Sequence, residues 1–241
     1  MIVQSSRDRV GIRTIALNRP PANAINYDMM RAVKVAFFEA SEDWETKVVV
    51  LTSTNEKFFS AGMDVKEARP SADTLPPAIP HYGMQLGREV FRVMHECKVP
   101  VIAKVRGMAI GAGFLYACLA DFAIASETAR FGQFEIKVNA VGGAGILRRM
   151  LSEQAMRYLT WTADLVSASD LVALGAGLRV VPDADLDAEV ERMARIIAAR
   201  PANVTRHSKY SFNQSEPFRP VDAYDIEQLH TLAIAVGDKL T

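Results

Sequence analysis

Apolar and polar positions alternate along Val10–Leu17, which is typical of a half-buried strand. Paired prolines and asparagines end this pattern, and a helix is expected to follow, with Asn26 as its N-cap. The buried face of that helix consists of apolar residues at helical spacing: Met30, Val33, Phe37 and Ala40. The next run, Lys47–Ser53, is rich in β-branched residues and too short for a helix, so it predicts a strand covered on both faces.

The middle of the chain continues this alternation of strands and helices. Tyr82–Cys97 has an apolar side at helical spacing and leads into a strand near Val99, and Phe122–Ala125 predicts another short strand. Small residues mark a turn at Phe58–Asp64. Four prolines among small and polar residues make Pro70–Pro80 a predicted mobile loop, and we expect it to act as a lid that becomes ordered when a ligand binds.

An apolar strand runs through a glycine-rich turn into an apolar helix at Lys104–Asp121. Glycine tolerates positive φ and has no Cβ, so a ligand can approach the backbone closely at Gly107, Gly111 and Gly113. The unpaired N–H groups at the start of the helix, near Ala112, suit an anion or a carbonyl oxygen that acquires negative charge. The spacing GxxxGxG differs from the GxGxxG of dinucleotide sites, which argues against nicotinamide binding. A corner needed only for packing fits this stretch equally well.

The pattern from Asp185 onward is helical, with prolines between the helices. Repeated strand–helix units before it predict an α/β fold with a core over residues 1–185 and a helical region over residues 186–241 that serves subunit contact. An apolar row near the C-terminus has no strand left to cover it: Leu229, Leu232, Ala233 and Val236. We therefore expect an oligomer.

Composition narrows the classes of partner. The 241 residues are 49% hydrophobic, which allows a sizeable core. Lys plus Arg and Asp plus Glu both number 28, so we expect neither nucleic acid nor a membrane surface as a partner. Cys97 and Cys118 form no CxxC pair and the four histidines have no metal-ligand spacing, so we expect no metal site. The sequence lacks a signal-peptide pattern and a run of membrane-span length, which predicts a cytoplasmic protein.

The segment FGQFEI at Phe131–Ile136 places one carboxylate, that of Glu135, among apolar neighbours. Burying an unpaired carboxylate is costly, and the displaced pKa that results is what a catalytic acid or base requires. An exposed glutamate on an edge strand fits the pattern equally well. Glu135 is therefore a candidate acid–base group.

Several segments resemble, in order and spacing, the enoyl-CoA hydratase/isomerase (crotonase) superfamily: LNRPPANAIN, FFSAGMDVKE, KVPVIAKVRGMAIGAGFLYACLADFAIAS, ARFGQFEIKVNAVGGAG and GLRVV. The resemblance runs from about Val10 to Pro182. It implies a crotonase-like spiral of repeated ββα units that holds an acyl-CoA pocket, followed by a C-terminal helical region that builds homotrimers, often paired into hexamers. It also implies an acyl-CoA thioester substrate and no cofactor beyond the CoA of that substrate.

Carried over by position, the resemblance assigns an oxyanion hole to the peptide N–H groups of Met63 and Ala112. Both lie in the glycine-rich turns, and fixed donors stabilise the charge of a thioester enolate without reorganising. The resemblance also implies contacts with CoA or the acyl group, largely through the backbone, at Asn23, Ala24, Ile25, Ala61, Met63, Asp64, Val65, Lys66, Gly111, Ala112 and Leu115.

The carboxylates depart from the pattern of the superfamily's hydratases, which generally use two glutamates. These align with Leu115 and Glu135, so only one is present. One base suffices to remove a proton and return it two carbons away, so a 3-enoyl to 2-enoyl-CoA isomerase is the leading hypothesis. An enoyl-CoA hydratase or hydratase-lyase in which Tyr116, Asp64 or His81 replaces the missing group is the alternative. A non-catalytic acyl-CoA binding or scaffold protein is the alternative of another class, and Leu115 favours it.

Overall fold

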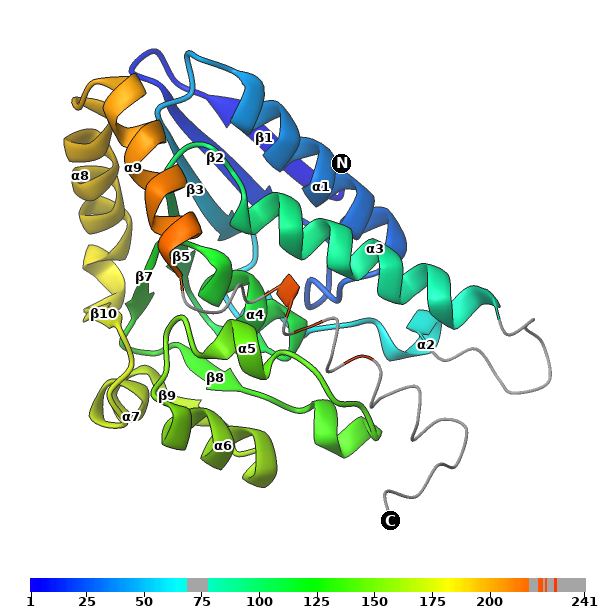
Figure 1. The fold of residues 1–241 in the computed structure, drawn as a ribbon. Helices are drawn as coiled ribbons and strands as arrows, with labels where there is room; N and C mark the ends of the chain where they lie inside the picture. Colours follow the sequence, from blue (N-terminus) through cyan, green and yellow to red (C-terminus); the bar gives the residue numbers. More distant parts are fainter. Residues whose placement is uncertain (69–77, 217–220, 223, 225–227, 229–241) are drawn as a thin grey trace.

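The computed structural model describes residues 1–68, 78–216, 221, 222, 224 and 228 (Figure 1). The larger of its two sheets has the strand order β1-β2-β3-β5-β7-β10. β1 and β2 pair antiparallel, and all later neighbours pair parallel. These strands are β1 (Val3–Arg7), β2 (Ile12–Leu17), β3 (Val48–Ser53), β5 (Val101–Val105), β7 (Phe122–Ser126) and β10 (Leu178–Val181).

The smaller sheet has the strand order β4-β6-β8-β9. Its strands are β4 (Phe58–Ser60), β6 (Met108–Ile110), β8 (Arg130–Gly132) and β9 (Val166–Ser167). The helices are α1 (Tyr27–Glu42), α2 (Val65–Ala68), α3 (Ala78–His95), α4 (Ala112–Leu119), α5 (Ala144–Leu147), α6 (Glu153–Thr162), α7 (Ala168–Ala173), α8 (Leu186–Ala198) and α9 (Ala202–Ser215), with short 3-10 turns η1 (Glu135–Val138) and η2 (Asp183–Asp185).

The chain winds through both sheets in a repeated order. Three times in succession, one strand enters the larger sheet, the next enters the smaller sheet, and helical structure follows. The strand pairs are β3 and β4, β5 and β6, and β7 and β8, and they are followed by α2 and α3, by α4, and by η1 and α5. This confirms the predicted α/β spiral of ββα units. β4 and β6 pair in parallel, so the turns that follow them lie close together at the same edge of the smaller sheet.

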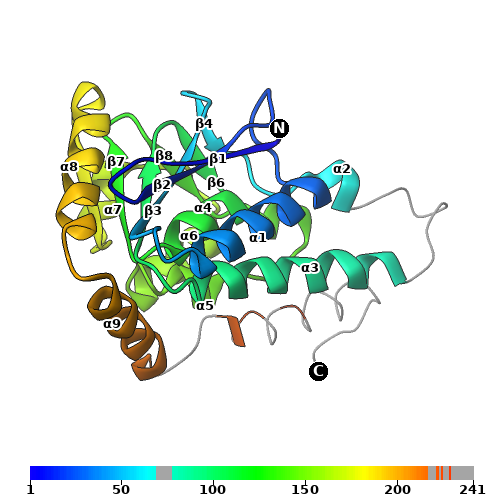
Figure 2. The ribbon, with the colours of Figure 1, turned by 90° about the horizontal axis from the view of Figure 1, so that it is seen from above.

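Helices cover both faces of the larger sheet (Figure 2). On one face, α1, α3 and α4 bury the main core, and the predicted face of α1 is fully inside it. The side chain of Asn26 accepts a hydrogen bond from the Met29 N–H at 2.9 Å, which confirms the predicted N-cap. On the other face, α8 packs Leu186, Val190 and Ala194 against the sheet. The segment after residue 185 therefore begins with a helix that completes the core.

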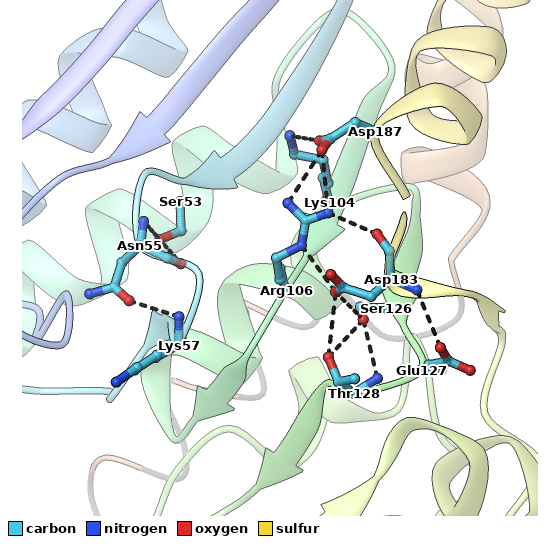
Figure 3. Close-up of polar contacts among 10 residues, drawn as sticks. All are labelled: Ser53, Asn55, Lys57, Lys104, Arg106, Ser126, Glu127, Thr128, Asp183 and Asp187. Atoms are coloured by element: carbon cyan, nitrogen blue, oxygen red, sulfur yellow. Dashed lines mark hydrogen bonds and ion pairs between the residues drawn. The ribbon is translucent and has the colours of Figure 1, made fainter. Parts of the chain in front are cut away.

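A network of polar side chains fastens η2 and α8 to the ends of the parallel strands (Figure 3). Lys104 Nζ lies 2.6 Å from Asp187 Oδ1, and Arg106 Nε donates to Asp183 Oδ1 at 3.1 Å. Ser126 Oγ donates to the same Asp183 oxygen at 2.5 Å. The opposite charges of this cluster neutralise one another. We therefore interpret the cluster as structural: it holds η2 and α8 against the strands.

The N-terminal hairpin differs from the prediction of a single strand over Val10–Leu17. β1 precedes it, and the observed second strand begins at Ile12. Asp8 Oδ1 accepts hydrogen bonds from the N–H groups of Val10, Gly11 and Ile12, each at 2.9 Å, and Gly11 has φ +97°. A carboxylate that satisfies three successive donors forms a turn, so Val10 lies in the turn and not in the strand.

Two other predicted segments fall partly outside the described residues. Of the predicted loop Pro70–Pro80, residues 78–80 belong to α3, and residues 69–77 lie outside the described residues. The apolar row from Leu229 to Val236 also lies outside them. α9 is described, and it is held to the core by two buried cations. Arg206 donates to the Ser41 carbonyl at 2.7 Å, and Lys209 lies 2.8 Å from Asp121 Oδ2.

Candidate active site

The two glycine-rich turns predicted from the sequence are in direct contact. Gly62 has φ +84°, and a Cβ added there would lie 2.8 Å from the carbonyl oxygen of Ile110 and 3.5 Å from the amide nitrogen of Ala112. No side chain fits in this space, because real Cβ atoms do not approach a carbonyl oxygen so closely. The missing Cβ at Gly62 therefore lets the turn after β4 lie against the start of α4.

A second contact between the same two segments joins Ser60, two residues before Gly62, to Gly113, one residue after Ala112. A Cβ added at Gly113 would lie 2.6 Å from the Ser60 Cβ and 2.8 Å from the Ser60 carbonyl oxygen. Gly111, the N-cap of α4, has φ +51°, a backbone conformation that glycine adopts readily. The packing interpretation of these glycines and the functional one are thus compatible, since close packing is what brings the two backbones together.

The predicted oxyanion-hole donors lie on these adjacent backbones. Ala112 is the first residue of α4, so its N–H has no intrahelical acceptor, and the first helical bond is Leu115 N–H to Gly111 O at 3.0 Å. Met63 forms a parallel bridge with Ile25, in which Ile25 uses both of its own backbone groups. In this pairing the Met63 N–H faces away from Ile25. No described residue accepts a hydrogen bond from it.

Glu135 begins η1, separated from the end of β8 by two residues, and is not on an edge strand. Its carboxylate lies over Gly111, because a Cβ added to that glycine would be 2.7 Å from Glu135 Oε1. The residue as a whole is half-buried, but Oε2 is buried and has no hydrogen-bond partner among the described residues. The carboxylate therefore points inward, next to the start of α4.

Burial sets the protonation of this carboxylate. Desolvation raises the pKa of Glu135 to about 7, and the N–H groups of Glu135 and Phe134 offset only part of that effect. A carboxylate with such a pKa exists in both forms near neutral pH, so it can accept a proton and give it back. The sequence-based expectation of a buried, perturbed glutamate is thus met by the geometry.

Leu115 forms an apolar wall one helical turn along α4. Its side chain is 2% exposed, and a Cβ added at Gly143 would lie 2.6 Å from Leu115 Cδ2. Gly143 has φ +90°, and it belongs to the loop that leads from η1 to α5. The position that the family resemblance aligns with a second glutamate thus carries an apolar side chain, packed beside the backbone of Gly143.

Gln133 is a buried polar residue that sequence reasoning missed. Its Nε2 donates to the Gly142 carbonyl at 3.0 Å, whereas its Oε1 is buried with no partner among the described residues. A Cβ at Gly143 would also lie 3.1 Å from Nε2, so the amide lies beside the Leu115 wall. The only available signal was its place two residues before Glu135.

The C-terminal region also reaches this loop. A Cβ added at Gly142 would lie 3.0 Å from a ring carbon of Tyr224, and the ring of Tyr224 packs edge-on against Phe91, with centroids 4.8 Å apart. Phe91 in turn packs edge-on against Tyr116 of α4, with centroids 6.0 Å apart. Tyr116 is fully buried in this aromatic cluster, and burial raises the pKa of its hydroxyl. Tyr116 therefore packs as a core residue, and its raised pKa keeps the hydroxyl protonated near neutral pH.

The predicted CoA-contact residues of the first loop and of the turn after β4 divide into two groups. Val65 and Lys66 are exposed in the first turn of α2, and Ala24, Ala61 and Met63 are half-buried. Three others are engaged within the protein: Asn23 and Ile25 are buried, and the Asp64 carboxylate forms an ion pair with Arg19. The side chain of His81 lies outside the described residues.

The described part of the chain contains neither a metal cluster nor a membrane-spanning helix. No three His, Cys, Asp or Glu side chains in it are close enough together to hold a metal ion. None of its helices is both long and apolar enough to cross a membrane.

Comparisons with known proteins agree with this geometry. A family model described as enoyl-CoA hydratase/isomerase matches residues 7–231. The protein named (7aS)-7a-methyl-1,5-dioxo-2,3,5,6,7,7a-hexahydro-1H-indene-carboxyl-CoA hydrolase from Rhodococcus jostii is 31% identical over 239 residues, covering 97% of this chain and 89% of that protein. A crotonyl-CoA hydratase from Syntrophomonas wolfei is 31% identical and covers 84% of this chain and 78% of its own.

Solved structures share the fold over nearly the whole length. The crystal structure of a probable enoyl-CoA hydratase from Mycobacterium smegmatis has a TM-score of 0.84 at 27% identity and covers 98% of this chain and 97% of its own. A family model and relatives that span most of the chain are sufficient evidence of membership. The chain therefore belongs to the enoyl-CoA hydratase/isomerase family and is an enzyme of the crotonase type.

Proposed function

We propose that this protein acts on an acyl-CoA thioester and moves a double bond from the 3-position to the 2-position through an enolate. The observation that carries the proposal is the buried carboxylate of Glu135, whose Oε2 has no partner among the described residues. It lies beside the start of α4, and Leu115 occupies the place of a second acid. A site with one proton carrier suits a reaction in which the proton that is removed is also returned.

In the proposed mechanism, the N–H groups of Met63 and Ala112 donate hydrogen bonds to the thioester oxygen. Glu135 removes a proton from the carbon between the thioester and the double bond, and the electron pair of the broken C–H bond delocalises onto that oxygen. The two fixed donors stabilise the negative charge, an effect for which one donor is typically worth 10²–10³ in rate. Glu135 then gives the proton to the far carbon of the former double bond, and the conjugated 2-enoyl thioester results.

The pKa of Glu135 suits both halves of this shuttle. At about 7, it leaves a large fraction of the carboxylate ionised at neutral pH and still makes the protonated form a competent acid. Hydration, by contrast, needs a second group to hold and activate water. Leu115 cannot do so, and the neighbouring Gln133 amide can accept a hydrogen bond but cannot take a proton near neutral pH.

The test compares matched 3-enoyl and 2-enoyl thioesters of CoA. Formation or loss of the conjugated thioester is followed by its absorbance, and addition of water is followed by product mass. We expect isomerisation to exceed hydration at equal substrate concentration. A hydration rate well above the isomerisation rate would reject the single-base assignment and favour the hydratase or hydratase-lyase alternative.

Hydrolysis of an oxo-substituted cyclic acyl-CoA is the second candidate. Two relatives named as hydrolases of a bicyclic dioxo carboxyl-CoA, from Rhodococcus jostii and Mycobacterium tuberculosis, align over 97% of this chain at 31% and 32% identity. In that reaction water would add to a ring carbonyl, the C–C bond between this carbonyl and the thioester α-carbon would break, and its electron pair would delocalise onto the thioester oxygen, where the same donors would stabilise it. A cyclic oxo-acyl-CoA belongs in the same panel, and ring opening with uptake of water would favour this candidate.

We further propose that the reaction needs no cofactor beyond the CoA of the substrate, since the proposed steps move only a proton. We also keep two predictions from the sequence. The protein forms a homotrimer or hexamer through residues 186–241, and it is located in the cytoplasm. The size of the assembly can be measured by light scattering, and a stable monomer at micromolar concentration would reject the oligomer.

A further inference from the structure

Arg19 joins the two segments on either side of the Met63 bridge. Its Nη1 donates to the carbonyl oxygen of Ala24 at 2.9 Å, and its Nη2 lies 2.8 Å from Asp64 Oδ2. Ala24 precedes Ile25 in the first loop, and Asp64 directly follows Met63 in the other segment. One guanidinium group therefore joins the two segments: it contacts the first segment just before Ile25 and the second segment just after Met63.

The backbone of Arg19 is itself fixed by Asn23. The Arg19 N–H donates to Asn23 Oδ1 at 2.6 Å, and the Asn23 N–H donates to the Arg19 carbonyl at 2.8 Å. Asn23 has φ +51° and is 1% exposed, and its Nδ2 donates to Ser53 Oγ at 2.7 Å. Ser53 starts the turn that links β3 to β4 (Figure 3). The guanidinium thus extends from a closed, hydrogen-bonded loop and not from a free surface segment.

A second side chain, that of Ser60, joins the same two segments before the pairing. Ser60 Oγ donates to the Asn23 carbonyl at 2.7 Å and accepts from the Gly62 N–H at 3.1 Å. Within the pairing, the Ile25 N–H donates to Gly62 O at 2.7 Å, and the Asp64 N–H donates to Ile25 O at 2.9 Å. The peptide that carries the Met63 N–H is therefore fixed on its N-terminal side by Ser60 and on its C-terminal side by the ion pair of Asp64.

We propose that the Arg19–Asp64 ion pair is a positioning device that sets the direction of the Met63 N–H toward the substrate oxygen. Neither side chain needs to touch the substrate, so both are positioning residues. The proposal rests on the proposed function only in taking Met63 N–H as an oxyanion donor. It also gives Asp64, which family resemblance assigns to CoA contact, a different role.

The geometry distinguishes this pair from ordinary surface ion pairs, which contribute little. Its side chains are 31% and 18% exposed, and the guanidinium also satisfies a backbone carbonyl. An arginine can make both contacts in one plane, whereas a lysine ammonium has no such fork. Displacing a catalytic donor by about 1 Å can cost on the order of 10²-fold in rate.

Kinetics of variants provide the first part of the test. We expect Arg19→Met and Asp64→Asn each to lower kcat by roughly 10- to 100-fold with KM changed less than about threefold, and the double variant to be no worse than either one. Arg19→Lys should fall between wild type and Arg19→Met. Arg31→Met is the matched control, because Arg31 forms an exposed ion pair with Asp28 on α1. It should keep wild-type kcat.

A spectroscopic measurement makes the test independent of the reaction type. A conjugated aryl-enoyl-CoA thioester shifts its absorbance to longer wavelength when donors polarise its carbonyl group. At saturation, wild type and Arg31→Met should show the same red shift, and Arg19→Met should lose most of it while its Kd stays within about threefold. Thermal unfolding shows that each variant is folded at the assay temperature.

The outcomes separate this proposal from the proposed function. If wild type shows the red shift but no isomerisation, the proposed reaction is rejected. The positioning role is then decided by the red shift alone: its loss in Arg19→Met supports the role, and its retention rejects it. A full red shift and wild-type kcat in folded Arg19→Met would overturn the proposal. Absence of a shift in wild type would overturn it as well, because no polarising donor would then exist to position.

Discussion

The two sides of the candidate active site are built in opposite ways. On the donor side, the loop around Asn23 and the turn around Met63 are joined by short hydrogen bonds and by the ion pair of Arg19 with Asp64. On the acid–base side, Glu135 Oε2 and Gln133 Oε1 are buried with no partner among the described residues. The side chains that hold the donor backbone are hydrogen-bonded, whereas the carboxylate proposed to react and the amide beside it each keep a buried oxygen without a partner among the described residues.

This difference has a physical reason. Donors that stabilise developing charge must be fixed in advance, and satisfied hydrogen bonds fix them at little cost. A proton carrier must instead have similar free energies in its two protonation states, and an ion pair or several donors would favour the ionised state of Glu135 too strongly. Burial without a cation leaves the pKa at about 7.

Glu135→Gln should have the largest effect. The amide keeps the shape of the side chain but cannot take a proton, so exchange of the thioester α-proton with deuterated water should fall by about 10²–10⁴-fold. Binding of a saturated acyl-CoA should stay nearly unchanged, because it relies on the backbone turns. Glu191→Gln on the surface of α8, which pairs with Arg195, is the control. Exchange at the wild-type rate in Glu135→Gln would mean that another group is the base.

Gly62→Ala should disrupt the donor side. The new Cβ would meet the Ile110 carbonyl oxygen at 2.8 Å, so the two turns must separate and the donors lose their common target. We expect kcat to fall by about 10²-fold. Gly175→Ala is the matched control, since Gly175 has φ +88° but nothing within 4 Å of an added Cβ. Equal losses in the two variants would show that backbone strain, and not separation of the turns, is the cause.

The buried carboxylate of Glu135 should make the free energy of unfolding depend on pH. Because the folded-state pKa of Glu135 is raised from 4.5 to about 7, the folded protein holds a proton that the unfolded chain releases. The stabilisation from this group is complete below about pH 4.5 and is lost as the pH rises through 7. The free energy of unfolding of wild type should therefore fall by about 2–3 kcal/mol more than that of Glu135→Gln when the pH is raised from 4 to 8. Denaturant titrations at both pH values measure this, and parallel curves would contradict the buried carboxylate.

The same pKa predicts the pH profile of the reaction. Only ionised Glu135 can remove the proton, so kcat/KM should fall about tenfold per pH unit below 7 and level off above it. The profile should be the same in Arg19→Met, in which the donor and not the base is altered. An inflection near pH 4.5 in wild type would mean that the carboxylate is solvated in the working enzyme.

Much of this site could be predicted from the sequence. Some of its features follow from local patterns, and others follow only from the family resemblance. Gly62 and Gly111 stand in small-residue turns after apolar strands, a local pattern that needs no tertiary information. The helix start at Ala112 and the N-cap at Asn26 follow from equally local signals and are confirmed. The family resemblance, not periodicity, supplied the pairing of Met63 with Ala112.

The features that the sequence could not predict depend on contacts between distant segments. Arg19 in LNRPP gives no sign that it bonds to Asp64, 45 residues later. Tyr224 lies far from Gly142 along the chain, and only the fold brings its ring against that loop. The hairpin strand β1 was missed because VQSSR has a single buried position. A pattern of apolar residues cannot mark a strand that is mostly exposed.

The smallest effect is expected where the two sides meet, at Leu115. Leu115→Glu would place a second carboxylate against Gly143 and within reach of Gln133 Nε2, which has a proton left to donate after its bond to Gly142. This amide would hold the new group, so water could be bound between it and Glu135. Two carboxylates in one pocket also raise each other's pKa, which limits how much of the ionised pair exists at neutral pH.

We therefore expect Leu115→Glu to raise hydration of a 2-enoyl-CoA only a few-fold while isomerisation falls by a similar factor. Leu115→Met conserves the volume and should change neither rate. Adding Gln133→Leu to Leu115→Glu should remove the gain, because the carboxylate would lose its donor. If hydration by wild type is already fast and Leu115→Glu leaves it unchanged, water is held elsewhere in the pocket, and the apolar wall at Leu115 does not decide the reaction.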